Sequence, residues 1–293
     1  MREEYEKLFE KDLALYLEHN THFHFKKLLG SLGKKPPYNS CFTLDTHYFF
    51  FGIIIIVRSR AESKAEEIYR AMKGAGTDEH ALIDVIIHSS DKQMEDTKQF
   101  FRQRYQKSMD EWIKGDTSGN FEKVLIHAIR ATRFEQVQPE LIDSDVETIY
   151  NAGEAKWGTD DNTFVEIFTS RSFEHLQLVN KRYAEKKGHD LAHVIKNETS
   201  GWYKVALLAC VTPPAEYWAE RCHQAIKGLG TDDKELVRCF SENSKPFLQE
   251  ISKDYERLYG KSLKQDIDGD TSGHYKQLLE ALLDLPQEER EQY

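Results

Sequence analysis

Apolar residues recur three and four positions apart along most of this chain, which is the spacing of amphipathic helices. Alternating runs of β-branched residues, which would indicate strands, are few. The chain of 293 residues holds only 7 prolines and 16 glycines, so long helices meet few interruptions. The pattern therefore predicts an all-α protein, and it is clearest in segments 81–90, 94–106, 174–186, 235–244 and 247–259.

A glycine-containing string occurs three times along the chain. It reads MKGAGTD from Met72, GEAKWGTD from Gly153 and IKGLGTD from Ile226. Downstream of each lies a second string that contains Thr-Ser-Gly. In these strings Asp116, Glu198 and Asp270 each lie 40 residues after the last glycine of the preceding loop. Three occurrences at one spacing indicate an internal repeat.

Each repeat is expected to contain five helices. Thr77, Thr159 and Thr231 are suited to be N-caps, because acidic residues follow them in the first turn. Each Thr-Ser-Gly is expected to open a further apolar helix. A helix before each glycine loop completes the set of five.

The paired strings are suited to bind a hard cation. Glycine allows the sharp turn that points carbonyl oxygens outward, and a cation such as Ca²⁺ takes six to eight oxygen ligands. Asp116, Glu198 and Asp270 are expected at helix starts, free to reach a neighbouring loop and complete its site. Water or a lipid phosphate oxygen can fill the positions left open. A single such loop would more simply be a helix–helix turn, and it is the repeated spacing that favours a metal site.

Charge and cysteine content limit the partners. The formal net charge is -10, so nucleic acid and anionic lipid repel the protein unless a cation intervenes. The four cysteines form no Cys-x-x-Cys pair, and we expect them to be reduced in a cytosolic protein. The apolar run at 48–57 is about half the length that a membrane-spanning helix needs.

From about Ser63 to Leu283 the chain resembles the annexins. The most specific segment, GEAKWGTDDNTFVEIFTSRSFEHL from Gly153, is similar to a third annexin repeat. The resemblance implies an all-α array of five-helix repeats that forms a curved disc, with calcium loops on a convex face that docks onto acidic phospholipid. It implies the second repeat at 61–134, the third at 143–212, the fourth at 213–285 and a tail at 286–293.

The resemblance also implies the calcium ligands. They are backbone carbonyls of each loop together with the downstream carboxylate. The implied metal ligands are Met72, Gly74, Gly76 and Asp116; Gly153, Lys156, Gly158 and Glu198; and Ile226, Gly228, Gly230 and Asp270. Trp157 lies inside the middle loop, either as a core residue or as an exposed ring that enters the lipid interface.

Residues 1–40 resemble only the back half of a first annexin repeat. The glycine loop that should precede them is absent, and the acidic position falls near Asn20. We expect no calcium there. Residues 41–60 are an apolar segment with no counterpart in the family pattern. The segment is either an insertion that touches a membrane or a partner, or translated non-coding sequence, and its flanks join naturally without it.

The expected function is calcium-dependent binding to anionic phospholipid membranes by a protein that is cytoplasmic and peripheral on membranes when calcium is raised. The alternative is a cytoskeletal or membrane scaffold with reduced calcium dependence and with protein partners. An enzyme is not expected, because GxSxG, HExxH and P-loop motifs are absent. Calcium is the expected cofactor, and no nucleic acid is expected.

Overall fold

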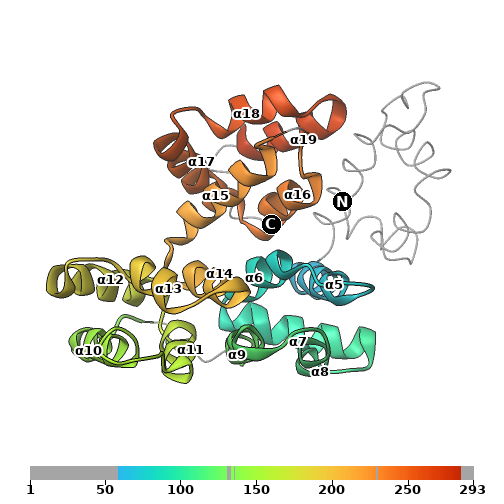
Figure 1. Cartoon of the computed structure of the whole chain (residues 1–293). Helices are drawn as coiled ribbons and strands as arrows, with labels where there is room; N and C mark the ends of the chain where they lie inside the picture. The colour runs from blue at the N-terminus through green and yellow to red at the C-terminus, as the bar shows by residue number, and fades with distance from the viewer. Residues whose placement is uncertain (1–58, 131–132, 135, 229, 285–293) are drawn as a thin grey trace. The chain divides into compact units, whose positions relative to one another are not determined.

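The computed structural model describes residues 59–130, 133–134, 136–228 and 230–284 (Figure 1). These ranges are helical and contain no strand, which confirms the all-α prediction. The first repeat predicted at 1–40 and the tail at 286–293 lie outside the described residues. Of the apolar segment at 41–60, only the last two residues are described, and Arg60 begins the first helix.

Fifteen α-helices occur in the described ranges, in three successive sets of five, as predicted. Helices α5 to α9 are Arg60–Met72, Glu79–Ile87, Asp91–Tyr105, Met109–Asp116 and Gly119–Ala128. A 3-10 turn at Pro139–Leu141 precedes α10 to α14, which are Ile142–Ala152, Asp161–Ser170, Phe173–Lys187, Leu191–Glu198 and Gly201–Val211. Helices α15 to α19 are Pro214–Ile226, Asp233–Glu242, Lys245–Tyr259, Leu263–Asp270 and Gly273–Asp284. None of these helices is both long and apolar enough to cross a membrane.

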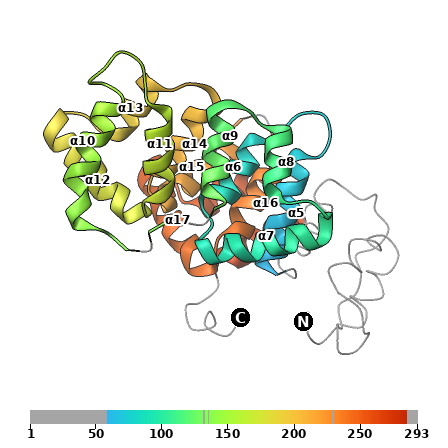
Figure 2. The same ribbon diagram turned by 90° about the horizontal axis from the view of Figure 1, so that it is seen from below.

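The described helices belong to two compact units, Arg60–Tyr217 and the part from Trp218 onward. In the first unit α5 packs on α7, and α10 packs on α12. Helices α9 and α14 contact each other and also contact α6 and α11, which joins the two five-helix sets (Figure 2). In the second unit α17 packs on α18 and α19.

The helices that connect the sets are the most apolar. In α6 the residues from Ala81 to Ile87 are all buried, so this helix is enclosed by its neighbours. Helices α9, α14 and α19 begin at Gly119, Gly201 and Gly273, which confirms the prediction that Thr-Ser-Gly opens an apolar helix. In the first unit the apolar helices α6, α9 and α14 thus lie where two repeats meet.

The prediction that Thr77, Thr159 and Thr231 are N-caps is wrong. The caps are the aspartates that follow them, and each accepts a hydrogen bond from a backbone N–H three residues on. Asp78 accepts from Ala81 at 2.9 Å, Asp160 from Thr163 at 3.3 Å and Asp232 from Glu235 at 3.1 Å. Either residue type can cap a helix. The aspartates take this role because the threonine hydroxyls bond to residues about forty positions downstream.

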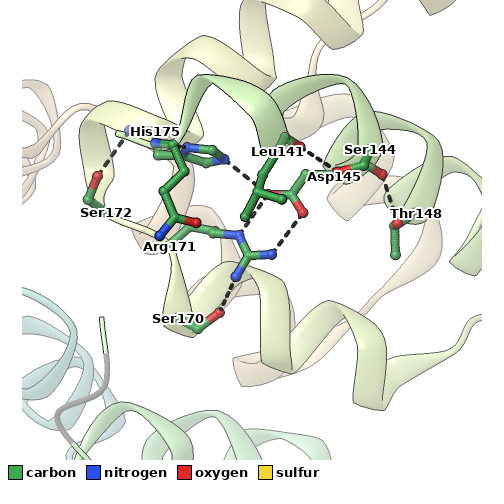
Figure 3. A network of polar contacts seen from close by, with 9 residues as sticks. Leu141, Ser144, Asp145, Thr148, Ser170, Arg171, Ser172 and His175 are labelled. Atoms are coloured by element: carbon green, nitrogen blue, oxygen red, sulfur yellow. Dashed lines mark hydrogen bonds and ion pairs between the residues drawn. The ribbon is translucent and has the colours of Figure 1, made fainter. Parts of the chain in front are cut away.

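A buried ionic cluster organises the set α10 to α14 (Figure 3). Asp145 of α10 is 4% exposed and forms a two-pronged pair with Arg171, with Nε–Oδ2 2.7 Å and Nη2–Oδ1 2.9 Å. The Nε2 atom of buried His175 lies 3.0 Å from Oδ2 of the same carboxylate. The backbone N–H of Gln138 donates to Nδ1 of His175 at 3.3 Å, which makes Nε2 the protonated nitrogen. One carboxylate therefore joins the start of α10 to the turn between α11 and α12.

Replacing Asp145 by Asn should lower the free energy of unfolding by about 3 kcal/mol, because Arg171 would lose its counter-ion in a buried place. Urea unfolding in calcium-free buffer measures this. The control is Asp143→Asn on the same helix, where the side chain is 63% exposed and little change is expected. Equal losses in the two variants would contradict the assignment.

His88 follows α6 and is stacked between two aromatic rings. Its ring centroid lies 5.4 Å from that of Phe173 and 4.2 Å from that of Tyr217, with interplanar angles of 15° and 23°. The Tyr217 hydroxyl donates to the buried carboxylate of Asp84. Burial lowers the pKa of His88 from 6.5 to about 3. The folded protein therefore holds this ring neutral over a range in which the unfolded chain protonates it.

Between pH 6.5 and pH 3 the unfolded state binds the proton and the folded state does not. His88 should therefore lower stability as the pH falls, by up to about 1.4 kcal/mol per pH unit. In His88→Phe, which keeps an aromatic ring in the stack, stability should depend less steeply on pH in this window. Urea unfolding at pH 7, 6, 5 and 4 provides the comparison. Parallel pH profiles for the two proteins would refute the effect.

Candidate metal centres

The three glycine loops share one backbone closure. The N–H of Asp78 donates to the carbonyl of Ala71 at 2.8 Å, and the equivalent bonds from Asp160 to Ala152 and from Asp232 to Ala225 are both 2.7 Å. Each loop is thus held shut at its base, below the residues predicted to bind metal. The loops α5–α6 and α10–α11 lie along the same edge of the first unit, at the top of Figure 2.

Glycine is needed in these loops for its backbone conformation. Gly74 and Gly76 have φ of 120° and 92°, and Gly228 and Gly230 have φ of 130° and 89°. These values lie in the left-handed region, where a side chain is strained. A Cβ atom at any of the four would meet nothing within 4 Å. The loop backbone is therefore open to solvent at these glycines, and a cation could reach its carbonyl oxygens.

The predicted carboxylate ligands do not begin a helix, as the sequence suggested, but end one. Asp116, Glu198 and Asp270 are the last residues of α8, α13 and α18. The C-terminal end of a helix carries the negative end of its dipole, so an additional carboxylate is unfavourable there. A cation bound nearby would remove that cost. The prediction was wrong because each acid lies only three residues before the glycine that begins the next helix, and it was assigned to that helix instead of to the helix before it.

In the second and third repeats the threonine after the loop contacts the carboxylate. The Thr77 hydroxyl lies 2.7 Å from Oδ2 of Asp116 and 3.2 Å from its carbonyl oxygen. The Thr159 hydroxyl likewise donates to Oε2 of Glu198 and lies 3.3 Å from its carbonyl. The structure therefore brings each acid to the exit of its loop. Sequence reasoning missed the threonines as anchors, although their constant separation of 39 residues from the acids was a visible signal.

Gly153 is required by a close approach of Glu198. It is buried, and its φ of -118° lies outside the left-handed region. A Cβ atom there would lie 3.2 Å from Cγ of Glu198 and 3.0 Å from Cζ of Phe164. The Glu198 side chain thus lies directly against the start of the loop. Lys156 and Gly158, the other predicted ligands of this repeat, are exposed.

The fourth repeat has a looser arrangement. The Thr231 hydroxyl donates at 3.1 Å to the backbone carbonyl of Asp270 and not to its carboxylate. Asp270 is exposed, whereas Asp116 and Glu198 are half-buried. The nearby Lys276 pairs with Asp268. The acid lies near its loop, but its side chain is not fixed there.

The donor set fits a hard cation. Met72 and Ile226 are buried side chains at the loop starts, so only their backbone carbonyls can serve as ligands. In the described part of the chain, no group of three or more His, Cys, Asp or Glu side chains is arranged to hold a metal. Carbonyl oxygens with a single carboxylate suit calcium rather than zinc.

The annexin sequence profile matches residues 63–128, 144–210 and 217–282. The chain belongs to the annexin family. Mouse (Mus musculus) annexin A4 is 40% identical over 219 residues, which are 73% of this chain and 69% of the relative. Human (Homo sapiens) annexin A13 is 36% identical over 228 residues, 76% and 72% of the two chains. The solved structure of annexin III is 31% identical with a TM-score of 0.81, and the match covers 98% of this chain and 83% of that one.

Membership makes this chain part of a calcium- and phospholipid-binding family with an all-α repeat fold. The three profile matches contain all three glycine loops and all three acids. The assignment of individual ligands in this annexin stays a prediction.

Gly153→Ala should destabilise the third repeat by about 1–2 kcal/mol, because the added methyl would press on the buried Phe164 ring and displace Glu198. The matched control is Gly115→Ala in α8, where a Cβ meets nothing within 4 Å and alanine favours the helix. Urea unfolding without calcium compares them. If Gly153→Ala unfolded like the control, the close approach would be disproved.

Proposed function

We propose that this annexin binds anionic phospholipid membranes only when calcium is present, with Ca²⁺ held between its helix loops and the lipid phosphates. The observation that carries the proposal is the position of Asp116 and Glu198. Each lies at the exit of an exposed glycine loop, at a helix end where its charge calls for a cation. Calcium is then the cofactor and the membrane surface the partner.

The ligands are the loop carbonyls of Met72, Gly74 and Gly76 with Asp116 in the second repeat. The third and fourth repeats use Gly153, Lys156, Gly158 and Glu198, and Ile226, Gly228, Gly230 and Asp270. Three carbonyls and one carboxylate leave part of a calcium shell open. Lipid phosphate oxygens complete it.

The acidic composition makes the metal necessary. At a net charge of -10 the protein is repelled by an anionic leaflet. Each bound Ca²⁺ adds two positive charges at the contact and joins two negative partners. The protein is accordingly cytoplasmic at low calcium and peripheral on membranes when calcium rises, and the proposal includes no catalytic step.

The Trp157 side chain supports a membrane contact at the third repeat. It lies between Lys156 and Gly158 and is 103% exposed, so the ring touches almost nothing in the protein. Exposed tryptophan is unfavourable in water and favourable at the boundary of headgroups and acyl chains. This exposure excludes a core role for the residue.

Sedimentation with vesicles of phosphatidylserine and phosphatidylcholine tests the proposal. The protein should pellet in calcium and stay in solution with excess chelator. The triple variant Asp116→Asn, Glu198→Gln, Asp270→Asn should need at least about tenfold more calcium, because each site loses its only charged ligand.

The matched control makes the same charge change at exposed acids outside the loops, Glu95→Gln, Asp143→Asn and Glu185→Gln. It should pellet like the natural sequence. If both triple variants behaved alike, net charge and not ligation would explain the effect. Pelleting that persists in chelator would reject the proposal and favour a calcium-independent scaffold.

A further inference from the structure

A second tryptophan lies close to the carboxylate of the third repeat. Trp202 is the second residue of α14, four positions after Glu198. It is 36% exposed, whereas Trp218 is only 2% exposed. A large apolar ring in the first turn of a helix that follows a predicted metal ligand has no obvious role in the core.

One histidine of the neighbouring repeat holds the Trp202 ring. The ring centroids of Trp202 and His80 lie 4.8 Å apart at an interplanar angle of 88°, an edge-to-face contact. His80 is the second residue of α6, four positions after Gly76. Helices α6 and α14 also pack on each other. The contact therefore joins the N-terminal end of α6 in the second repeat to the N-terminal end of α14 in the third.

One exposed tryptophan lies on a segment that contacts Glu198, and the other lies on the segment that follows Glu198 in the chain. Trp157 belongs to the loop that ends at Gly158, and the next residue, Thr159, donates its hydroxyl to Glu198. Trp202 follows Glu198 through a short connection in which Gly201 takes φ of 58°. A lipid phosphate that reached a cation at Glu198 would have one indole on each of the two chain segments that form the site.

We propose that Trp202 is a second membrane-contacting side chain of the third repeat, and that the phospholipid interface docks there on two indoles rather than one. His80 is a positioning residue that covers part of the ring and leaves the rest exposed. The inference rests on the proposed function, because it assumes that this edge of the protein meets lipid. It adds an apolar contact specific to one repeat.

Fluorescence of Trp202 alone tests the contact. The variant Trp112→Phe, Trp157→Phe, Trp218→Phe keeps this indole as the only one. The probe is a vesicle of phosphatidylserine and phosphatidylcholine brominated on the upper acyl chain. With calcium, the emission should shift to shorter wavelength and be quenched by the bromines, and chelator should reverse both changes.

The outcomes separate the two proposals. If this variant pellets with vesicles in calcium but its emission is not quenched, Trp202 is only an inter-repeat packing residue, and the inference is overturned while the proposed function stands. If the natural sequence does not pellet in calcium, the proposed function itself is overturned.

A second measurement needs no multiple variant. Trp202→Ala in the otherwise natural chain should weaken vesicle binding about tenfold at fixed calcium, as expected for losing about a third of a tryptophan's apolar surface from a lipid contact. The control is Leu178→Ala on α12, which is 42% exposed and belongs neither to a glycine loop nor to a segment that carries a predicted carboxylate ligand, and it should bind unchanged. In the variant that keeps Trp202 as the only tryptophan, His80→Ala should broaden the emission without calcium. Equal binding of Trp202→Ala and Leu178→Ala would overturn the inference.

Discussion

The hydrogen bond from a threonine at the exit of a glycine loop to an acid 39 residues later is the constraint on which the sites depend. It crosses from one helix pair to another within a repeat and fixes a carboxylate at the negative end of a short helix. Such a position is unfavourable for an isolated anion. In the proposed function a bound cation would offset this electrostatic cost. The threonine holds the acid in place without the cation.

Comparison of the three repeats shows that the backbone determines the shape of the loop and the side chains determine the position of the acid. All three loops are closed at the base by the same backbone hydrogen bond, with lengths of 2.7 to 2.8 Å. The contact of the acid differs, because Asp116 and Glu198 bond to threonine through their side chains and Asp270 only through its carbonyl. Helix packing and positive-φ glycines thus form the loop in every repeat. Whether the acid is pre-organised is decided locally, and a ligand that must be ordered on binding loses affinity.

Much of the fold followed from the sequence because its signals are local. Helical periodicity, the glycine loops and Thr-Ser-Gly gave three sets of five helices. The N-caps were assigned to Thr77, Thr159 and Thr231 instead of the next aspartates, because Ser, Thr, Asp and Asn are similarly good caps and local sequence cannot rank two neighbours. The aspartate becomes the cap because the threonine hydroxyl bonds to an acid 39 residues downstream. The contact between His80 and Trp202 was beyond prediction for the same reason, since it depends on how two repeats pack.

Stability and the proposed binding use different groups in this protein. The buried ionic cluster of Asp145, Arg171 and His175 and the stacked His88 lie among packed helices, and their partners are protein atoms. Trp157 and the loop glycines other than Gly153 are exposed and contribute little to the core. Because the free energy of folding is a small difference between large terms, an exposed indole and uncompensated acids at helix ends are tolerated only if packing elsewhere supplies a surplus. The cluster at Asp145 provides such packing in the same repeat, at the end of α10 away from the loop that carries Trp157. The repeat with the most exposed apolar ring is thus also held by a two-pronged buried ion pair.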